Sequence, residues 1–332
     1  MPPVEPMLAK LQPDIPIGDG WLYEPKWDGF RAIVYRDGDE VHIGSRDRKP
    51  LERYFPEMIA VLKLALPKRC VLDGELVIAT PAGVDFDALQ MRIHPAESRV
   101  RMLSQEIPAT YIAFDLLALN SIDLMGQPAH ERRTALEKLL PVASTTEVPE
   151  PLTVLMTPQT DDAGLGREWF EGLEAWGLDG LIAKQRDSAY SPGKRTMIKI
   201  KHKRTADCVV GGYRLSKTKD GIGSLLLGVY DEEGIFHYVG HSSSFKAAER
   251  RELLAQLQEL RNDASFGDGR TPGGPSRWTG TRDLSWTPIE QVLVCEVSYD
   301  HMQGDRFRHA ATFIRWRDDK TPQECTFEQL RT

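Results

Sequence analysis

Lys26 stands in a string of residues that could support covalent chemistry. Glu24 precedes it and Asp28, Gly29 and Arg31 follow it, in the order Glu-Pro-Lys-Trp-Asp-Gly-Phe-Arg. A lysine amine can attack an electrophilic centre and form a covalent intermediate when it is unprotonated. Asp-Gly is also a common turn pair that basic residues flank. The string alone favours a nucleophilic lysine over a surface turn, and the other motifs add to it.

Acidic residues on apolar runs are the second chemical feature. Asp73 and Glu75 lie two residues apart in an expected strand, so both side chains point to the same face. Asp179 stands just before another apolar run, which ends at Lys184. A carboxylate on an apolar strand is costly to bury unless a ligand or a cation satisfies it. We predict that Asp73, Glu75 and Asp179 bind a divalent metal ion.

Two sets of cations complete the pattern. Lys199 and Lys201 alternate with Ile198 and Ile200, so the two lysines share one face of a strand and suit a polyanion such as a triphosphate. A solvated edge strand is the alternative interpretation. The string Arg-Trp-Arg-Asp-Asp-Lys near the C-terminus supplies the second set, which is Arg315, Arg317 and Lys320. A nucleophile, a metal and charge neutralisation are the parts that phosphoryl-type transfer requires.

The composition is that of a globular protein large enough for two domains. The chain has 332 residues, of which 41% are apolar and 27% charged. It contains no apolar stretch that would span a membrane and no signal-peptide pattern at residue 1, so we expect a cytoplasmic protein with no membrane partner. The four cysteines lack Cys-x-x-Cys spacing, which argues against a zinc module and a disulfide framework: Cys70, Cys208, Cys295 and Cys325.

The formal net charge of −7 does not by itself suggest a nucleic-acid-binding protein. Phosphate contacts need a local basic strip rather than a basic protein, and residues 184–204 form such a strip. A solvated charged face is the alternative. The strip consists of Lys184, Arg186, Lys194, Arg195, Lys199, Lys201, Lys203 and Arg204.

These residues must be positioned by short strands that alternate with a few helices, which predicts an α+β protein. The expected strands cover 32–35, 71–79, 111–119, 181–184, 197–201, 208–215, 225–230, 236–241, 292–299 and 312–316. The expected helices cover 52–66, 130–140, 167–176 and 246–261, the last with Ser244 as N-cap. Residues 263–282 are expected to form a loop. We place a domain boundary between 1–203 and 204–332, and the second domain has the elements of an OB-type barrel.

In their order and spacing, the motifs resemble those of the covalent nucleotidyltransferases, and within them the ATP-dependent DNA ligases. All six motifs of that family are present between Glu24 and Lys320. Strings such as Tyr-Ser-Pro-Gly-Lys-Arg at 190–195 look most like the LigC/LigD-like ligases of bacterial end joining. The resemblance implies a nucleotidyltransferase (ATP-grasp-like) adenylation domain with antiparallel sheets, followed by an OB-fold β-barrel.

The resemblance also implies a three-step reaction that uses ATP and Mg²⁺ or Mn²⁺. Lys26 attacks the α-phosphate of ATP and releases pyrophosphate. The AMP then passes to the 5′-phosphate of a break in duplex DNA, and the 3′-hydroxyl displaces AMP to close the backbone. This chemistry serves DNA repair, including non-homologous end joining.

Individual roles in nucleotide binding follow from the same resemblance. Glu24 matches the residue that recognises the adenine amino group. Arg31 and Glu75 match contacts to the AMP ribose. Phe114 matches the aromatic residue that stacks on adenine, although a core position in its apolar run is the alternative. Lys184 belongs to the same nucleotide-binding set.

Other positions match contacts to phosphate and metal. Arg46 matches an arginine that binds phosphate near the nick, and Lys199 and Lys201 match the pair on the α-phosphate. Asp179 stands where the family usually has a metal-binding glutamate, so its metal contact is expected to run through water. The C-terminal set matches the residues that orient pyrophosphate as leaving group.

The implied partners are nicked or gapped duplex DNA and, from the family alone, Ku and a primase-polymerase. We expect a monomer associated with the nucleoid, with no DNA-binding domain ahead of Lys26. Two alternatives remain at this point. One is an RNA ligase or capping-type nucleotidyltransferase, and the other is a non-catalytic OB-type nucleic-acid-binding protein, which the intact Lys26 disfavours.

Overall fold

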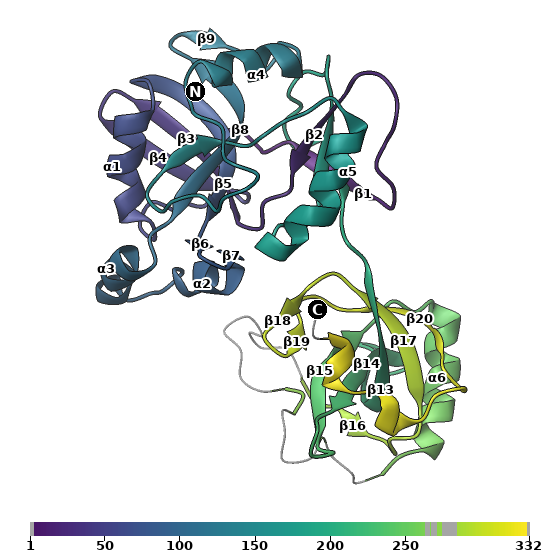
Figure 1. Ribbon diagram of the computed structural model, residues 1–332. Coiled ribbons are helices and arrows are strands. Elements are labelled where there is room, and N and C mark those ends of the chain that lie inside the picture. Colours follow the sequence, from purple (N-terminus) through teal and green to yellow (C-terminus); the bar gives the residue numbers. More distant parts are fainter. Residues whose placement is uncertain (1–2, 263–265, 267–270, 274–283, 331–332) are drawn as a thin grey trace. The chain divides into compact units, whose positions relative to one another are not determined.

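The computed structural model describes residues 3–262, 266, 271–273 and 284–330. The chain divides into two compact units, Met1–Lys201 and His202–Thr332 (Figure 1). The division falls inside the basic strip, two residues before the boundary placed from the sequence. No helix in the described part of the chain is long and apolar enough to cross a membrane.

The larger sheet of the first unit has the strand order β10-β8-β5-β3-β4, with β9 paired to β8 (Figure 1). All neighbouring pairs are antiparallel except β10 and β8, which are parallel. The strands are β3 (Phe30–Asp37), β4 (Glu40–Ser45), β5 (Arg69–Val77), β8 (Thr110–Leu119), β9 (Ile122–Asp123) and β10 (Val154–Met156).

A second, four-stranded sheet of this unit has the order β1-β12-β11-β2. Strand β11 is antiparallel to both of its neighbours, and β1 runs parallel to β12. A short hairpin, β6 with β7, lies outside both sheets. The strands are β1 (Leu8–Gln12), β2 (Trp21–Pro25), β6 (Ala79–Thr80), β7 (Gly83–Val84), β11 (Leu181–Gln185) and β12 (Arg195–Ile200).

Helices cover the sheets of the first unit through apolar residues on one side. In α1, Met58 and Leu62 are fully buried in the core of the larger sheet, and Pro56 occupies the first turn, where its missing N–H costs nothing. The helices are α1 (Pro56–Ala65), α2 (Phe86–Met91), α3 (Glu97–Glu106), α4 (Ala129–Glu137) and α5 (Ala163–Gly172), followed by a 3₁₀ turn at Leu173–Trp176.

The register of these strands places the chemical residues. Arg31 on β3 lies opposite Glu75 on β5. In the smaller sheet, Ile182 on β11 lies between Glu24 on β2 and Lys199 on β12. The segment between β2 and β3 carries Lys26, so this lysine lies where the chain crosses from one sheet to the other.

The second unit is built on a five-stranded antiparallel sheet of order β15-β14-β13-β17-β20, with β16 paired to β13 (Figure 1). A parallel bridge between Ser242 and Ala311 joins the ends of the two edge strands, as a closing barrel requires. The strands are β13 (Arg204–Leu215), β14 (Ile222–Tyr230), β15 (Phe236–Ser242), β16 (Thr287–Pro288), β17 (Val294–Tyr299), β18 (Met302–Gln303), β19 (Arg306–Phe307) and β20 (Thr312–Trp316).

Helix α6 (Ala247–Glu259) packs on this barrel through Leu253 and Leu257, as its leucine spacing predicts. The prediction of Ser244 as its N-cap is wrong. The cap is Lys246, whose backbone N–H donates to Glu249, while Ser244 accepts a bond from the N–H of Phe313. The unit ends in 3₁₀ turns at Pro322–Glu324 and Phe327–Leu330.

The ten predicted strands and four predicted helices all overlap observed elements, and the four cysteines are buried and unpaired as expected. The sequence analysis missed several elements, of which β2 matters most. Strand β2 contains Glu24 and Pro25, residues that disfavour a strand, and tertiary burial outweighs that preference. Most of the predicted loop 263–282 lies outside the described residues.

Gly180 offers a test of how the two sheets are joined. Its φ of 125° lies in a region that favours glycine, and an added Cβ would collide with the carbonyl oxygen of Ile200. We expect Gly180→Ala to lower the free energy of unfolding by at least about 2 kcal/mol. Gly18→Ala is the matched control, because Gly18 has a φ of 119° but open space around it. Equal melting temperatures for the two variants in thermal unfolding would contradict this expectation.

Candidate active site

The side chain of Lys26 is held by a buried carboxylate that lies near the end of the first unit's sequence. Its Nζ lies 2.6 Å from Oδ2 of Asp179, and Nζ of Lys201 lies 2.9 Å from the same oxygen. Two backbone bonds fix the pair: the N–H of Lys26 donates to Gly180, and the N–H of Asp179 donates to the carbonyl of Lys26. Burial alone raises the pKa of Asp179, but the two ammonium groups outweigh it and lower it to about 2. Asp179 is therefore an anion that orients the amine.

Lys199 lies on the face of β12 that is opposite Ile198 and Ile200, as predicted. Ile198 and Ile200 are buried on the opposite face in the core of the smaller sheet, so the predicted alternation is confirmed. Burial, followed by the neighbouring charges of Lys201 and Lys26, lowers the pKa of Lys199. The exposed guanidinium of Arg46 adds to this repulsion. Four cations thus converge on one region that would be relieved by a polyanion.

Glu24 is almost fully buried, and two donors satisfy it. Nζ of Lys184 lies 2.8 Å from its Oε2, and the amide of Gln159 donates to Oε1 at 2.6 Å. Lys184 also donates to the carbonyl oxygen of Phe114 at 3.0 Å, which ties β11 to β8. Glu24 is thereby fixed as an acceptor beside Phe114.

Phe114 is half-buried, and it belongs to none of the apolar core clusters of the described chain. The guanidinium carbon of Arg31 lies 4.4 Å from its ring centroid, and Nζ of Lys184 lies 5.1 Å from it. A ring that contacts cations and is not enclosed by apolar side chains is suited to stacking on a planar ligand.

Asp73 pairs with a cation of the protein, whereas the sequence predicted that it binds a metal ion. It is fully buried, and both of its oxygens accept bonds from the guanidinium of Arg31, while Oδ2 also accepts a bond from the hydroxyl of Tyr190 at 2.6 Å. These contacts use the carboxylate as a partner of Arg31. Its predicted role as a metal ligand therefore receives no support from this geometry.

Glu75 contrasts with Asp73. Within the described residues it makes no hydrogen bond, and burial raises its pKa to about 7 against the opposing charges of Lys26 and Arg31. It is thus a buried carboxyl group with no hydrogen-bonded counter-ion in the described chain, and an added cation would favour its charged form. The described residues contain no group of three or more His, Cys, Asp or Glu side chains that would hold a metal by themselves.

The predicted C-terminal cations are paired within the second unit. Arg317 binds both oxygens of Asp207 at 2.9 and 3.0 Å, and Lys320 lies 2.8 Å from the same carboxylate. Arg315 is exposed and pairs with Glu296 at 2.7 Å. The structure therefore brings Arg317 and Lys320 together on Asp207, whereas Arg315 points to a different acid.

Two family models account for most of the sequence. The ATP dependent DNA ligase domain matches residues 6–201, and the ATP dependent DNA ligase C terminal region matches residues 218–320. The chain belongs to the ATP-dependent DNA ligases. This ligase is similar to DNA ligase C of Mycobacterium tuberculosis, with 51% identity over 99% of the chain and 94% of the relative. It is also 30% identical to the multifunctional non-homologous end joining protein LigD of Mycobacterium bovis, covering 93% of the chain and 37% of that protein.

A solved structure supports the same assignment. The structure is similar to that of the ligase domain of M. tuberculosis LigD, with a TM-score of 0.50 and 28% sequence identity. The alignment covers 97% of this ligase and 98% of that domain. The predicted family, fold class and activity, ATP-dependent ligation of DNA by an enzyme of the LigC/LigD type, are thus confirmed. The RNA ligase, capping enzyme and non-catalytic alternatives are not favoured.

Three partners of the predicted site residues were not singled out in the sequence: Gln159 and Tyr190 in the first unit and Asp207 in the second. Gln159 gave no signal, because a lone glutamine in a loop has no pattern. Asp207 did give one, since it is an acid at the start of an apolar strand, as Asp73 is. Tyr190 stands in a string that supported the family resemblance, but its contact with Asp73 spans 117 residues and appears only in the fold.

Phe114→Ala tests whether the ring binds nucleotide. We expect weaker ATP binding with a melting temperature close to that of the unaltered ligase, because Phe114 lies outside the apolar clusters. Phe55→Ala is the matched control: Phe55 is fully buried, and its loss should cost about 3–5 kcal/mol. A large drop in the melting temperature of nucleotide-free Phe114→Ala would assign the ring to the core instead.

Proposed function

We propose that Lys26 is the nucleophile that carries AMP in this ligase. The observation that supports this is the position of its amine, 2.6 Å from Asp179 and beside Lys199 and Lys201. In the first step Nζ forms a bond to the α-phosphorus of ATP, the bond from that phosphorus to the bridging oxygen breaks, and pyrophosphate leaves. Nζ first loses a proton to solvent water to become the attacking amine, and the second proton, displaced when the N–P bond forms, also passes to water. Asp179 holds the amine in place, since a group with a pKa of about 2 is a weak base.

The nucleotide is bound by side chains on both sheets. Glu24 accepts a hydrogen bond from the adenine amino group, and Phe114 stacks on the base. Arg31 contacts the ribose. Lys199 and Lys201 neutralise the α-phosphate, and this relieves the repulsion that the cluster of cations creates in the nucleotide-free ligase.

Mg²⁺ fits two of the three carboxylates that the sequence pointed to. Magnesium sites in nucleotide-binding enzymes use one or two carboxylates, with the remaining ligands from phosphate and water. Glu75 makes no hydrogen bond in the described chain, and both ammonium groups that contact Asp179 lie on its Oδ2. Arg31, in contrast, occupies both oxygens of Asp73. When bound, the ion would neutralise phosphate charge during transfer.

The C-terminal cations act in the first step. We infer that Arg315, Arg317 and Lys320 orient the pyrophosphate leaving group. This requires Arg315 to leave Glu296, Arg317 to leave Asp207 and Asp319, and Lys320 to leave Asp207. Once pyrophosphate has left, these side chains have no further part in the chemistry.

The DNA substrate is contacted by basic side chains outside the nucleotide pocket. We infer that Arg46 and the exposed members of the basic strip bind the phosphate backbone of nicked or gapped duplex DNA. The LigD relatives are named for non-homologous end joining. By analogy, this ligase acts as a cytoplasmic, nucleoid-associated monomer in DNA repair, with Ku and a primase-polymerase as partners.

Lys26→Ala should abolish the covalent protein–AMP adduct. Lys184 on β11, Lys199 on β12 and Lys201 just after β12 start from other parts of the backbone and cannot place an amine where Lys26 does. Intact mass after incubation with ATP and Mg²⁺ measures the adduct. Lys138→Ala, which removes an exposed lysine of the same unit, should keep it. An adduct of AMP mass in Lys26→Ala would place the nucleophile elsewhere.

Arg315→Ala combined with Lys320→Ala should strongly reduce adduct formation from ATP while most sealing of pre-adenylated nicked DNA is retained. The reason is that only the first step has pyrophosphate to orient. Single-turnover rates for both reactions provide the measurement. Arg251→Ala with Lys246→Ala, which removes two cations elsewhere in the same unit, controls for charge. If sealing falls as far as adenylation, these residues hold DNA or the fold instead.

A further inference from the structure

A closed ring of hydrogen bonds lies behind Arg31. Nε of Arg31 donates to Oδ1 of Asp73 at 2.6 Å, and Nη2 donates to Oδ2 and to the carbonyl oxygen of Met7 at 3.2 Å. The N–H of Met7 donates to the hydroxyl of Tyr190 at 2.9 Å, and that hydroxyl donates to Oδ2 of Asp73 at 2.6 Å. Three residues from three other stretches of the chain, Met7, Asp73 and Tyr190, thus fix the guanidinium of Arg31.

The hydroxyl of Tyr190 determines which groups donate and which groups accept in this ring of hydrogen bonds. A tyrosine hydroxyl has one proton to donate, and here it goes to Asp73, while the hydroxyl oxygen accepts the N–H of Met7. Burial, and then the carboxylate of Asp73, raise the pKa of Tyr190, so the hydroxyl keeps that proton. Without it, Asp73 would be held by Arg31 alone and could rotate together with it.

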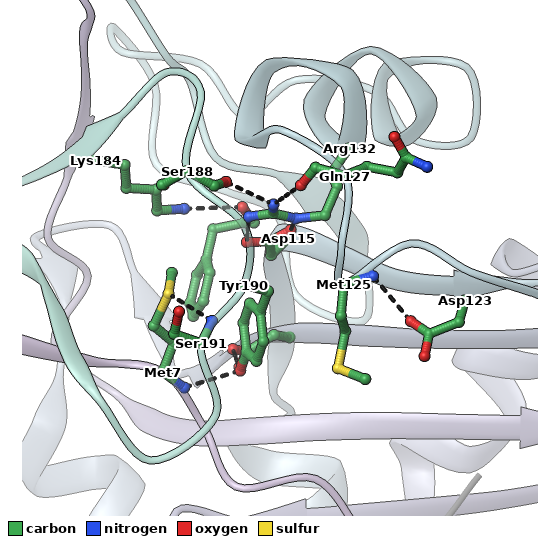
Figure 2. Close-up of polar contacts among 12 residues, drawn as sticks. Met7, Asp115, Asp123, Met125, Gln127, Arg132, Lys184, Ser188, Tyr190 and Ser191 are labelled. Atoms are coloured by element: carbon green, nitrogen blue, oxygen red, sulfur yellow. Dashed lines mark hydrogen bonds and ion pairs between the residues drawn. The ribbon is translucent and has the colours of Figure 1, made fainter.

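Tyr190 is itself held from outside the nucleotide site (Figure 2). Its backbone N–H donates to Met125, and Arg132 donates to the carbonyl oxygen of Ser188 at 3.0 Å. Arg132 is fully buried and makes a two-pronged ion pair with Asp115 at 2.7 and 2.9 Å. The segment that presents the hydroxyl is therefore anchored on α4 and β8 independently of Arg31.

We propose that Tyr190 is a positioning residue for nucleotide binding, acting through Asp73 on Arg31. In the described part of the chain, Nη1 of Arg31 is the guanidinium nitrogen that makes no hydrogen bond, because Nε and Nη2 are both used. The ring of bonds turns Nη1 away from Asp73 and lays the guanidinium against Phe114, 4.4 Å from its ring centroid. This inference rests on the proposed role of Arg31 in contacting the nucleotide.

The test begins with Tyr190→Phe, which removes one oxygen atom from a buried ring. The matched control is Tyr35→Phe: the hydroxyl of Tyr35 also accepts a backbone N–H from the N-terminal segment, that of Val4, but makes no hydrogen bond to Asp73 in the described chain. Each protein is first treated with pyrophosphate to remove bound AMP. Single-turnover adduct formation is then followed against ATP concentration.

We expect Tyr190→Phe to raise the half-saturating ATP concentration by about fivefold or more, as the loss of a hydrogen bond to a charged group does. The rate at saturating ATP should change much less, because the groups around Lys26 are untouched. Tyr35→Phe should leave both values unchanged. An equal effect from the two variants would mean general loosening of the fold and would overturn the inference.

A double-mutant cycle with Arg31→Lys decides whether Tyr190 acts through Arg31. Lysine keeps a charge near Asp73, so the fold is supported, but it cannot present the guanidinium nitrogen. In the Arg31→Lys background, Tyr190→Phe should have no further effect on the half-saturating ATP concentration. The same factor in both backgrounds would overturn the inference. So would a Tyr190→Phe single variant that leaves the half-saturating ATP concentration unchanged while the Arg31→Lys single variant raises it. If Arg31→Lys itself changes nothing, the proposed role of Arg31 is wrong.

Discussion

The contact between Lys26 and Asp179 is the constraint on which the site depends. It joins the crossing from β2 to β3 with the entry to β11, through two backbone hydrogen bonds and an ion pair of 2.6 Å. Gly180 permits this approach, because any Cβ there would meet the backbone of β12. The same carboxylate contacts Lys201, so one anion holds both the proposed nucleophile and a lysine proposed to bind phosphate.

The acidic residues around this contact differ in function because their partners differ. Asp73 is saturated by Arg31 and Tyr190 and serves to orient a cation. Burial raises the pKa of Glu75, which lies on the same strand, makes no hydrogen bond in the described chain and is proposed to meet an added ion. Glu24 is satisfied by Lys184 and Gln159 and is held as an acceptor beside Phe114. Burial makes each unpaired charge costly, so the pairing scheme assigns the roles.

The second unit shows the same principle in a reversible form. Asp207 neutralises Arg317 and Lys320, the cations proposed to meet pyrophosphate. A carboxylate that holds two cations in place when ATP is absent spares them the cost of an unpaired state. It also means that ATP must compete for them, and a triphosphate carries enough charge to do so. The second unit thus supplies its cations in an ordered arrangement.

The sequence by itself determined the family, the fold class and the ligase activity, because motif order and strand alternation are local properties. It also predicted the domain boundary and the residues proposed for the site. The paired lysines on β12 and the leucine face of α6 followed from spacing alone. Only the tertiary structure decided which charged side chains form pairs with one another. Asp73 and Glu75 look equivalent in the sequence. In the structure Arg31 and Tyr190, the latter 117 residues from Asp73, form hydrogen bonds with Asp73 and not with Glu75. Strand β2 formed against its residue preferences, and Gln159 and Asp207 gained their roles from partners that lie more than 100 residues away. Such pairings depend on long-range packing, which no local pattern encodes.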